Sequence, residues 1–302
     1  MKNRKNPVPA ILWTVVLALS FYIIFQFFLS SPHLEVAFID VGQGDSAYIG
    51  TPSGKTVILD AGGSVFGQTR VGERVVGSYL IKRGKFSVDM AIASHYHADH
   101  VKGIIELSDV VKIKNFMLPD VEYRPRLHDD LVSAANQAGA NVHYISRGQD
   151  INVDEDTKFI TLFPLQSGIS EHSGVSYMSK KDPNNDSLVL KLTYGNTSFL
   201  FTGDLESDAE LALLEDSRLN SDVLKVGHHG SKTSTGQEFL EKVAPSFAVI
   251  SVGGNNNYGH PHHDVLERLI LSNAKTYRTD FHGTVTFLVD KSGIFTIKTS
   301  RN

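Results

Sequence analysis

Residues 89–100, DMAIASHYHADH, place an apolar stretch directly before three histidines and an aspartate. The stretch 89–95 predicts a buried strand, so the residues that follow lie at the edge of a sheet. His95 and His97 alternate and can reach one metal ion, while Asp99 and His100 turn toward a second ion about 3.5–4 Å away. Imidazole and carboxylate groups are ligands for zinc, manganese and iron. The pattern therefore predicts a metal site, against the alternative of a solvated polar turn.

Composition restricts the ligands that such a site can use. The 302 residues include no cysteine, which excludes disulfides, thiolate metal ligands and cysteine nucleophiles. Nine of the 13 histidines fall in two windows, 95–100 and 228–282. A metal site in this chain must be built from His, Asp and Glu.

The N-terminus carries a second informative feature. Residues 8–29 are apolar, and no charged residue occurs between Lys5 and Glu35. About 20 apolar residues are enough to cross a bilayer as a helix, and the basic residues before them predict a cytoplasmic N-terminus. We therefore expect residues 1–30 to form a basic segment and a membrane anchor, with the remaining chain outside the membrane. The alternative is a cleaved signal peptide and a secreted protein, although the run is longer than the usual 7–15 residues and no A-x-A site follows it.

The rest of the chain alternates strand and helix patterns. Strands are expected at 34–41, 46–51, 56–62, 89–95, 114–118, 142–145, 158–163, 187–194, 197–202, 222–227 and 247–253, with a closing hairpin at 284–298. Helices are expected at 71–83, 205–215, 236–242 and 262–272. Strands in two groups with helices between them predict an α/β fold, in which two sheets pack face to face with helices outside, as one domain over residues 34–300.

The motif H-x-H-x-D-H, formed here by His95, His97, Asp99 and His100, resembles the signature of the metallo-β-lactamase superfamily. The resemblance covers essentially all of residues 34–300 and implies an αββα sandwich with two divalent metal ions. In LDAG, Asp60 and Gly62 match the D-x-G turn that the family keeps behind its metals. In FTGD, Asp204 matches the carboxylate that bridges both metals.

The motif VGHHGS fills the last ligand position of the family by its order along the chain. One of its two histidines is expected to coordinate; we favour His228 and assign His229 to a hydrogen bond with an anionic substrate. His260, in YGHP, is a candidate proton donor to the leaving oxygen, or a plain loop histidine. His262 and His263 are expected to be exposed residues at the start of a helix.

One position departs from the family pattern. The third histidine of the first metal is replaced in PNNDSLVLKL by Asn185, Asp186 and Ser187, and His172 lies outside the expected context. The first metal would then be held, more weakly, by His95, His97 and Asp204. This departure argues against a true β-lactamase.

Five motifs, DVGQGDS (40–46), NNDSLVL (184–190), FTGDLE (201–206), LKVGHHGS (224–231) and YGHP (258–261), resemble the metallo-hydrolase domain of ComEC, a DNA-uptake channel protein, and the freestanding proteins related to it. The resemblance implies a metal-dependent phosphodiesterase, a DNase acting outside the membrane. Asp40 and Asp45 of the first motif are expected to be structural residues near the site.

Two zinc or manganese ions would supply a metal-activated hydroxide near neutral pH, with Asp99 as a further catalytic residue. Candidates for phosphate contacts are Lys225, Ser187, Asn185 and His229. Without Lys2, Arg4 and Lys5, 26 basic residues face 33 acidic ones, a net charge of −7 with neutral histidines. Nucleic-acid binders usually carry a basic surface, so this charge speaks against a strongly held DNA substrate.

Two other functions remain open at this point. The first is a phosphoesterase acting on cell-envelope material such as choline-decorated teichoic acid, because an esterase of that kind shares the fold and a DVGQGDS-like start. The second is a metal-stabilised binding module without catalysis. The sequence does not identify protein partners.

Overall fold

The computed structural model describes residues 12–21, 33–64, 69–165 and 183–301. Residues 12–21 are helical. Most of the predicted span 8–29 lies outside the described residues, as does His172. Within the described ranges, no helix is both long and apolar enough to cross a membrane. The N-terminal membrane helix therefore stays a prediction.

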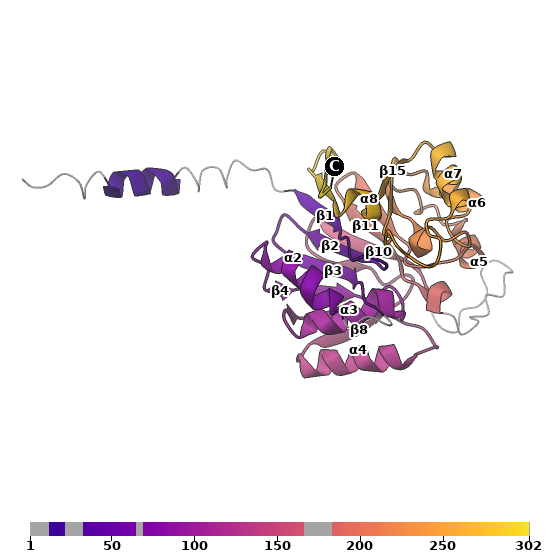
Figure 1. Cartoon of the computed structure of the whole chain (residues 1–302), viewed down its shortest axis with the longest axis horizontal. Helices are drawn as coiled ribbons and strands as arrows, with labels where there is room; N and C mark the ends of the chain where they lie inside the picture. Colours follow the sequence, from indigo (N-terminus) through magenta and orange to yellow (C-terminus); the bar gives the residue numbers. More distant parts are fainter. Residues whose placement is uncertain (1–11, 22–32, 65–68, 166–182, 302) are drawn as a thin grey trace, which may run out of the picture.

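Two large sheets face each other in the folded part of the chain (Figure 1). The eight-stranded sheet contains, in spatial order, β17 (Phe295–Thr299), β16 (Val285–Val289), β1 (Leu34–Phe38), β2 (Ser46–Gly50), β3 (Thr56–Ala61), β5 (Met90–Ile92), β7 (Asn115–Pro119) and β8 (Asn141–Ile145). The seven-stranded sheet contains β15 (Lys275–Arg278), β14 (Phe247–Ile250), β13 (Val223–Lys225), β12 (Thr197–Phe201), β11 (Val189–Tyr194), β10 (Thr157–Phe163) and β9 (Ile151–Asn152). Two short strands, β4 (Ser87–Val88) and β6 (Lys112–Ile113), pair separately.

Helices cover the outer face of each sheet (Figure 1). The eight-stranded sheet is covered by η1 (Gly72–Gly77), α2 (Ser78–Ile81), α3 (Ala98–Ser108) and α4 (Arg126–Gln137). The seven-stranded sheet is covered by α5 (Ser207–Glu210), η3 (Leu211–Leu213), α6 (Gln237–Val243) and α7 (His263–Leu271). Strand alternation explains the layers: in β1, Val36 and Phe38 face the other sheet, while Ala37 faces the helices. The predicted α/β sandwich is confirmed.

Strand direction sets one edge of this sandwich apart. In the eight-stranded sheet β3, β5, β7 and β8 run parallel, and in the seven-stranded sheet β12, β13, β14 and β15 do. Loops that leave the carboxyl ends of parallel strands meet at one edge, where α/β proteins usually bind their ligands. The motifs around His95, Asp204 and His228 follow β5, β12 and β13 at these ends.

The expected strands all have a counterpart, and the helices expected at 71–83, 236–242 and 262–272 correspond to η1 with α2, α6 and α7. The helix expected at 205–215 is two short helices, α5 and η3. Our sequence-based assignment missed α3, α4, β15 and the short strands β4, β6 and β9. The residues after His97 were expected to form a loop, whereas they begin α3, with His97 as its N-cap residue.

Candidate metal centre

The first turn of α3 carries two of the predicted ligands, Asp99 and His100. The helix lies close to β3, because Gly103 has no side chain: a Cβ there would lie 2.0 Å from the carbonyl oxygen of Ala61. The loop before β2 packs on the same turn, where the N–H of Asp45 donates to the carbonyl of Asp99 over 3.2 Å. These contacts bring Asp45 and His100 to the same place.

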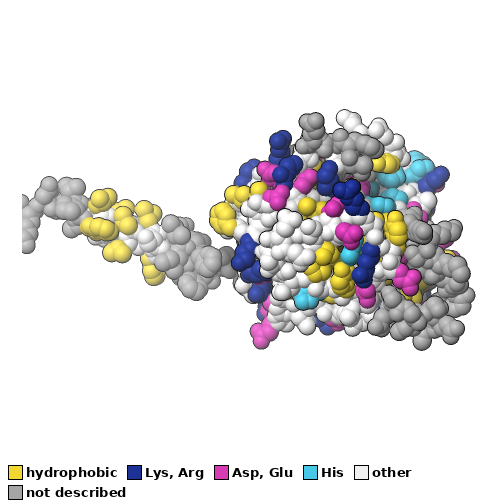
Figure 2. Space-filling view, turned by 90° about the horizontal axis from the view of Figure 1, so that it is seen from below, with side chains coloured by type: hydrophobic (Ala, Val, Ile, Leu, Met, Phe, Trp, Pro, Cys, Tyr) yellow, Lys and Arg dark blue, Asp and Glu magenta, His cyan; other side chains and the backbone are white. Residues whose placement is uncertain are grey.

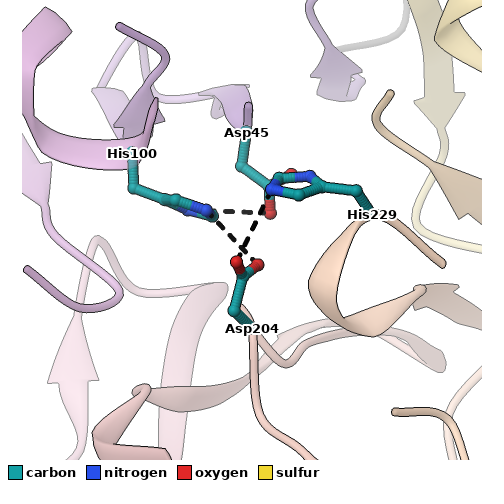
Figure 3. A group of neighbouring side chains, drawn as sticks. All are labelled: Asp45, His100, Asp204 and His229. Atoms are coloured by element: carbon teal, nitrogen blue, oxygen red, sulfur yellow. Dashed lines mark ion pairs between the residues drawn. The ribbon is translucent and has the colours of Figure 1, made fainter. Parts of the chain in front are cut away.

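Four buried side chains, Asp45, His100, Asp204 and His229, form a first candidate metal-binding group (Figure 3). They come from the β1–β2 loop, α3, the residues after β12 and the η4 turn (Gly227–Gly230). The His100 Nε2 lies 3.3 Å from Oδ1 of Asp204. The His229 Nε2 lies 3.5 Å from Oδ2 of Asp204 and 3.2 Å from Oδ2 of Asp99.

A second group consists of His95, His97 and Asp204, so Asp204 belongs to both groups. The Nε2 of His95 lies 3.1 Å from Nδ1 of His97 and 3.8 Å from Oδ2 of Asp204. Among the described residues, no third histidine joins this group. This second group corresponds to the metal that we called the first from the sequence, for which three protein ligands were expected.

The buried polar atoms at the centre test whether these residues fit a metal ion. Nε2 of His100, Nε2 of His229 and Oδ1 of Asp204 are buried, and none has a hydrogen-bond partner of suitable geometry among the described residues. Leaving such atoms unsatisfied is costly, and native proteins rarely do so without an ion or a water molecule. The donor set of imidazole and carboxylate groups suits a divalent cation. The site therefore fits the metal that the motifs predict.

Behind His100, an aspartate fixes the ring. Asp60 is fully buried, and its Oδ2 lies 2.9 Å from Nδ1 of His100. Its carboxylate also accepts hydrogen bonds from the N–H and the hydroxyl of Ser94 at 2.8 and 2.6 Å. A carboxylate on Nδ1 leaves Nε2 of the imidazole as the metal ligand. The predicted structural role of Asp60 has this physical basis, and Gly62 beyond it adopts a positive φ of 67°.

A buried ion pair lies behind His229. The Lys225 Nζ lies 2.7 Å from Oδ2 of Asp45 and donates to the carbonyl of Val226 over 2.8 Å. The other oxygen of Asp45 lies 3.2 Å from Nδ1 of His229, which also faces the carbonyl of Ser251 at 3.0 Å. Lys225 is only 3 % exposed. Its predicted role as a phosphate contact is therefore wrong, because the ammonium group is buried on Asp45.

Backbone conformation decides between the two adjacent histidines. His228 and His229 have φ angles of 47° and 54°, in the left-handed region that non-glycine residues seldom adopt. This turn buries His229 in the first group, while His228 remains 22 % exposed on its side chain, with Nδ1 3.3 Å from Glu206 Oε1. The Nε2 of His228 lies 3.8 Å from Asp204. The geometry favours His229 as the ligand, the reverse of our sequence-based preference.

Ser187 and Asn185, both predicted to contact the substrate, make hydrogen bonds to the loop that carries Asp204. Ser187 is fully buried, and its Oγ accepts a hydrogen bond from the N–H of Asp204 over 3.1 Å. The Asn185 Oδ1 accepts one from the N–H of Glu206 over 3.1 Å. Both side chains hold the loop that carries Asp204. Their contacts with phosphate stay a prediction.

Asp40 is a structural residue, as expected. Its Oδ1 accepts a hydrogen bond from the N–H of Gly42 over 3.2 Å, and its Oδ2 pairs with Arg301 at 2.6 Å. Asp45 was also expected to be structural, and its contacts with Lys225 and with Nδ1 of His229 agree with that role, although it lies within reach of the first metal-binding group. Only the folded chain shows this, because the side chain is brought to His229 from more than 180 residues away.

The pocket favours positive charge, carried either by protonated imidazoles or by a metal ion that would take the place of their protons. Burial alone would lower the pKa of His229, but the carboxylates of Asp204 and Asp45 outweigh it and raise the pKa to about 10. His100 behaves in the same way: burial opposes its positive charge, and Asp204 and Asp60 raise its pKa well above the usual value. Burial would raise the pKa of Asp204, yet His100 and His229 hold it well below its usual range. Burial and the neighbouring His100 lower the pKa of His95, so this ring is neutral and able to ligate.

The two groups open into a cleft of about 260 Å³. Its lining includes Gln43, His97, Asp99, Tyr258 and His260. Histidine side chains gather on one part of the surface (Figure 2). His260 contacts the ring of His228 with centroids 5.6 Å apart. Burial, together with His228, lowers the pKa of His260 to about 4.

The remaining predicted histidines lie at the start of α7. His262 is its N-cap residue and accepts a hydrogen bond from the N–H of Asp264, and the side chain of His263 is 77 % exposed. Both lie at the start of a helix, as predicted, but only His263 is exposed, whereas His262 is half-buried. Tyr258, Gln43 and Glu206 were not singled out from the sequence, although YGHP, DVGQGDS and FTGDLE contain them.

Comparison with known proteins supports the motif-based interpretation. A profile of the metallo-beta-lactamase superfamily matches residues 39–254. ComE operon protein 3 of Bacillus subtilis is 32 % identical over 88 % of this chain, and Competence protein ComA of Neisseria gonorrhoeae is 32 % identical over 84 %. Recombination protein 2 of Haemophilus influenzae is 32 % identical over 89 % of this chain. The chain spans 34 %, 32 % and 30 % of these three proteins, respectively. The predicted resemblance to ComEC-type competence proteins is confirmed.

Solved structures share the fold at low sequence identity. The metallo-beta-lactamase fold protein YhfI from Bacillus subtilis has a TM-score of 0.52 and 13 % identity, covering 86 % of this chain and all of that one. The diiron beta-hydroxylase CmlA from Streptomyces venezuelae has a TM-score of 0.52 and 12 % identity, covering 85 % of this chain and 54 % of that one. With the sandwich, the metal-binding residues at its edge and the profile match, the chain belongs to the metallo-β-lactamase superfamily.

Proposed function

We propose that this protein is a metal-dependent phosphodiesterase that cleaves DNA. The observation that carries the proposal is the pair of ligand groups that share Asp204 and open into one cleft. Two metal ions held about 3.5–4 Å apart are typical of enzymes that hydrolyse phosphate esters. The similarity to three competence and recombination proteins supports DNA as the substrate.

His100, His229 and Asp204 would hold one divalent ion. Asp99, predicted as a further ligand, lies outside the four-residue group, but its Oδ2 is 3.2 Å from Nε2 of His229 and can reach the same ion. His95, His97 and Asp204 would hold the other. When bound, the two ions activate water and neutralise charge on the phosphate. The set of His95, His97 and Asp204 has only three protein ligands, so we expect it to bind its metal ion more weakly than the other set does. Histidine-rich sets suit zinc, and carboxylates with open positions also suit manganese.

The side chains at the cleft have separate tasks in this proposal. Burial would raise the pKa of Asp99, but His100 and His229 lower it, so the carboxylate is ionised at neutral pH and can orient a water molecule. His260 is neutral at pH 7 and can donate one hydrogen bond to the leaving oxygen. The partly exposed His228 can contact a non-bridging phosphate oxygen.

A metal-loaded site could bind a nucleic acid in spite of the acidic composition of the chain. Residues 34–302 carry 26 basic and 33 acidic side chains, so the attraction to a nucleic acid must come from the site itself. Bound divalent ions supply that attraction locally. We therefore expect a shallow dependence of KM on salt, because few Lys or Arg side chains contact phosphates.

We further propose that the N-terminal apolar segment anchors the protein with its catalytic domain outside the membrane. The apolar run 8–29 and the basic residues before it support this location. N-terminal sequencing of the mature protein tests it, because a start near Ser31 would show a cleaved signal peptide and a secreted enzyme.

The decisive experiment uses the full-length chain in detergent, stripped of metal and then loaded with Mn²⁺ or Zn²⁺. Its substrates are plasmid DNA, bis-p-nitrophenyl phosphate and a phosphocholine ester. We expect cleavage of DNA and loss of at least 10³-fold of it in Asp204→Ala, with the circular dichroism spectrum unchanged. Release of phosphocholine without DNA cleavage would favour the cell-envelope phosphoesterase. No turnover with either metal would favour the binding module.

A further inference from the structure

An exposed aromatic ring lies at the rim of the metal cleft. Tyr258 is in the loop between β14 and α7, is 66 % exposed and lines the cleft. One face of its ring lies on His260, with centroids 5.7 Å apart and planes inclined by 26°. His260 in turn lies 6.4 Å from the ring of His229, which belongs to the first metal group. The aromatic ring of Tyr258 is therefore one side chain away from the candidate ligands.

The loop that carries Tyr258 is held in place by one side chain, Asn256. Its Nδ2 donates to the carbonyls of Gly253 and His260 over 2.8 and 2.7 Å. Its Oδ1 accepts from the N–H groups of Tyr258 and His260 over 3.1 and 3.0 Å. An asparagine side chain has two donor hydrogens and one acceptor oxygen with two lone pairs, so all of them are used here. The loop is thus fixed before any substrate arrives, which lowers the entropy cost of binding to it.

Large exposed aromatic rings at a binding cleft usually contact a ligand. Tyr258 carries a flat ring, and the other residues that line the cleft are mostly polar, among them Gln43, Asp99 and His260. A flat ring in polar surroundings suits a planar group that is itself bordered by polar atoms. Nucleobases meet this description, and they stack on aromatic side chains in a manner that tolerates any sequence.

We propose that Tyr258 is a stacking platform for an unpaired nucleobase next to the phosphodiester in the cleft. The inference rests on the proposed function and extends it to a preference for single-stranded over duplex nucleic acid. A base inside a duplex already stacks on both faces, so only an unpaired or terminal base can occupy the ring. Asn256 is then a positioning residue that acts through Tyr258.

Phosphocholine is the other ligand that an aromatic ring could receive, through a cation–π contact. Sites for quaternary ammonium groups usually surround the cation with several aromatic rings. Among the described residues that line the cleft, Tyr258 is the one aromatic residue other than histidine. A single open ring favours the base over the choline group.

The test compares two oligonucleotides of equal length on the full chain loaded with Mn²⁺. One is an oligothymidylate, and the other carries the same phosphodiester backbone with abasic tetrahydrofuran sites. In Tyr258→Ala we expect KM for the oligothymidylate to rise about 10-fold with little change in kcat, and KM for the abasic strand to stay constant. Tyr258→Phe and Tyr258→Trp should keep the wild-type KM, because both retain a flat ring.

Phe86→Ala provides the matched control. Phe86 is 69 % exposed, and it lies just before β4, at the opposite end of β5 from His95. Its removal deletes an exposed aromatic ring of similar size without touching the cleft, so neither KM should change. Asn256→Ala should raise KM for the oligothymidylate in the same direction as Tyr258→Ala, without raising KM for the abasic strand. Because Asn256 also holds the backbone of His260, kcat should fall on both strands in this variant.

The outcomes separate this inference from the proposed function. If the wild type cleaves both strands and Tyr258→Ala cleaves them equally well, the platform is overturned while the phosphodiesterase stands. An equal rise in KM on both strands would also overturn it, because the ring would then act on the backbone. If phosphocholine competes with the oligothymidylate in the wild type and not in Tyr258→Ala, the ring of Tyr258 binds a quaternary ammonium group, and its assignment to a nucleobase is overturned. If the wild type cleaves neither strand with any metal, the proposed function itself fails.

Discussion

His228 and His229 are chemically identical neighbours in very different surroundings, and substitution should distinguish them. His229→Ala removes a buried ring nitrogen that faces Asp204, so we expect the chain to retain one metal ion instead of two. His228→Ala removes a partly exposed ring, so both ions should remain, with turnover reduced by about 10-fold. Metal analysis after loading and gel filtration measures the difference. Loss of an ion in His228→Ala alone would restore the sequence-based assignment.

The buried pair of Lys225 and Asp45 gives a second prediction at this scale. Burial would raise the pKa of Asp45, but Lys225 and His229 hold it below its usual value. Lys225→Met removes one of the positive neighbours of a buried carboxylate, and we expect the free energy of unfolding to fall by about 3 kcal/mol. Urea unfolding in EDTA measures this change.

Two further variants make that result specific. Lys114 pairs with Asp89 at 2.7 Å, but its side chain is 49 % exposed, so Lys114→Met should cost less than about 1 kcal/mol. The double variant Asp45→Asn/Lys225→Met removes both buried charges and should recover part of the loss. If Lys225→Met lowers the free energy of unfolding no more than Lys114→Met does, the buried ion pair does not stabilise the fold.

The sequence indicated which residue types would form this site, but not every individual role. H-x-H-x-D-H and FTGD were informative because strand ends fix where His95, His100 and Asp204 lie. The choice between His228 and His229 depends on two left-handed φ angles, which no side-chain pattern encodes. Lys225 was predicted to contact the substrate because the sequence does not show that it is buried. Its burial depends on Asp45, which reaches it from a distant loop.

At the scale of elements, Glu210 ties α5 to the start of α6. Its Oε1 accepts from the N–H of Thr235 over 2.5 Å and its Oε2 from the N–H of Gly236, the N-cap residue of α6, over 2.8 Å. Burial raises the pKa of Glu210 from 4.5 to about 7, in spite of these donors. Between these two values the folded protein keeps a proton that the unfolded chain releases. Stability from this group is therefore lost as the pH rises through 7.

Glu210→Gln removes this titration and tests the sign. The stability of the wild type relative to Glu210→Gln should fall by about 2–3 kcal/mol between pH 5 and pH 8. Groups that titrate elsewhere act equally in both proteins and cancel in the difference, which urea unfolding measures at each pH. Glu241→Gln, at an exposed position of α6, is the matched control and should follow the wild type. A difference that stays constant with pH would mean that Glu210 is ionised throughout.

Elements were predictable where hydrophobic periodicity was strong. Alternation in β1 and the apolar runs of β5, β12 and β13 identified the strands of both sheets. The helix α3 was missed because its first turn contains Asp99 and His100, which were interpreted as loop ligands. Its start is decided by packing: Gly103 against Ala61 and Gly44 against Asp99 leave room only for backbone, and such close approaches depend on tertiary structure.

At the scale of the molecule, the candidate metal centre joins the two sheets. Asp45, His95, His97 and His100 belong to the half built on the eight-stranded sheet, while Asp204 and His229 follow strands of the other sheet. The carboxylates of Asp45 and Asp99 come from the first half and that of Asp204 from the second, and, against the effect of burial, positively charged neighbours lower the pKa of all three. A cation bound by residues of both halves would link them, so metal binding should stabilise the whole fold.

The size of this effect follows from linkage. A metal ion present at about 100 times its Kd adds roughly 2.7 kcal/mol, which corresponds to a rise in Tm of about 5–10 °C for a domain of this size. Thermal unfolding in EDTA, Mn²⁺ and Zn²⁺ measures the shift in the full-length chain. Asp204→Ala should abolish it, because Asp204 belongs to both ligand groups. Asp156→Ala removes an exposed carboxylate and should leave the shift intact. Equal shifts in the two variants would mean that the metal binds elsewhere, and that the sheets are held together by their apolar interface alone.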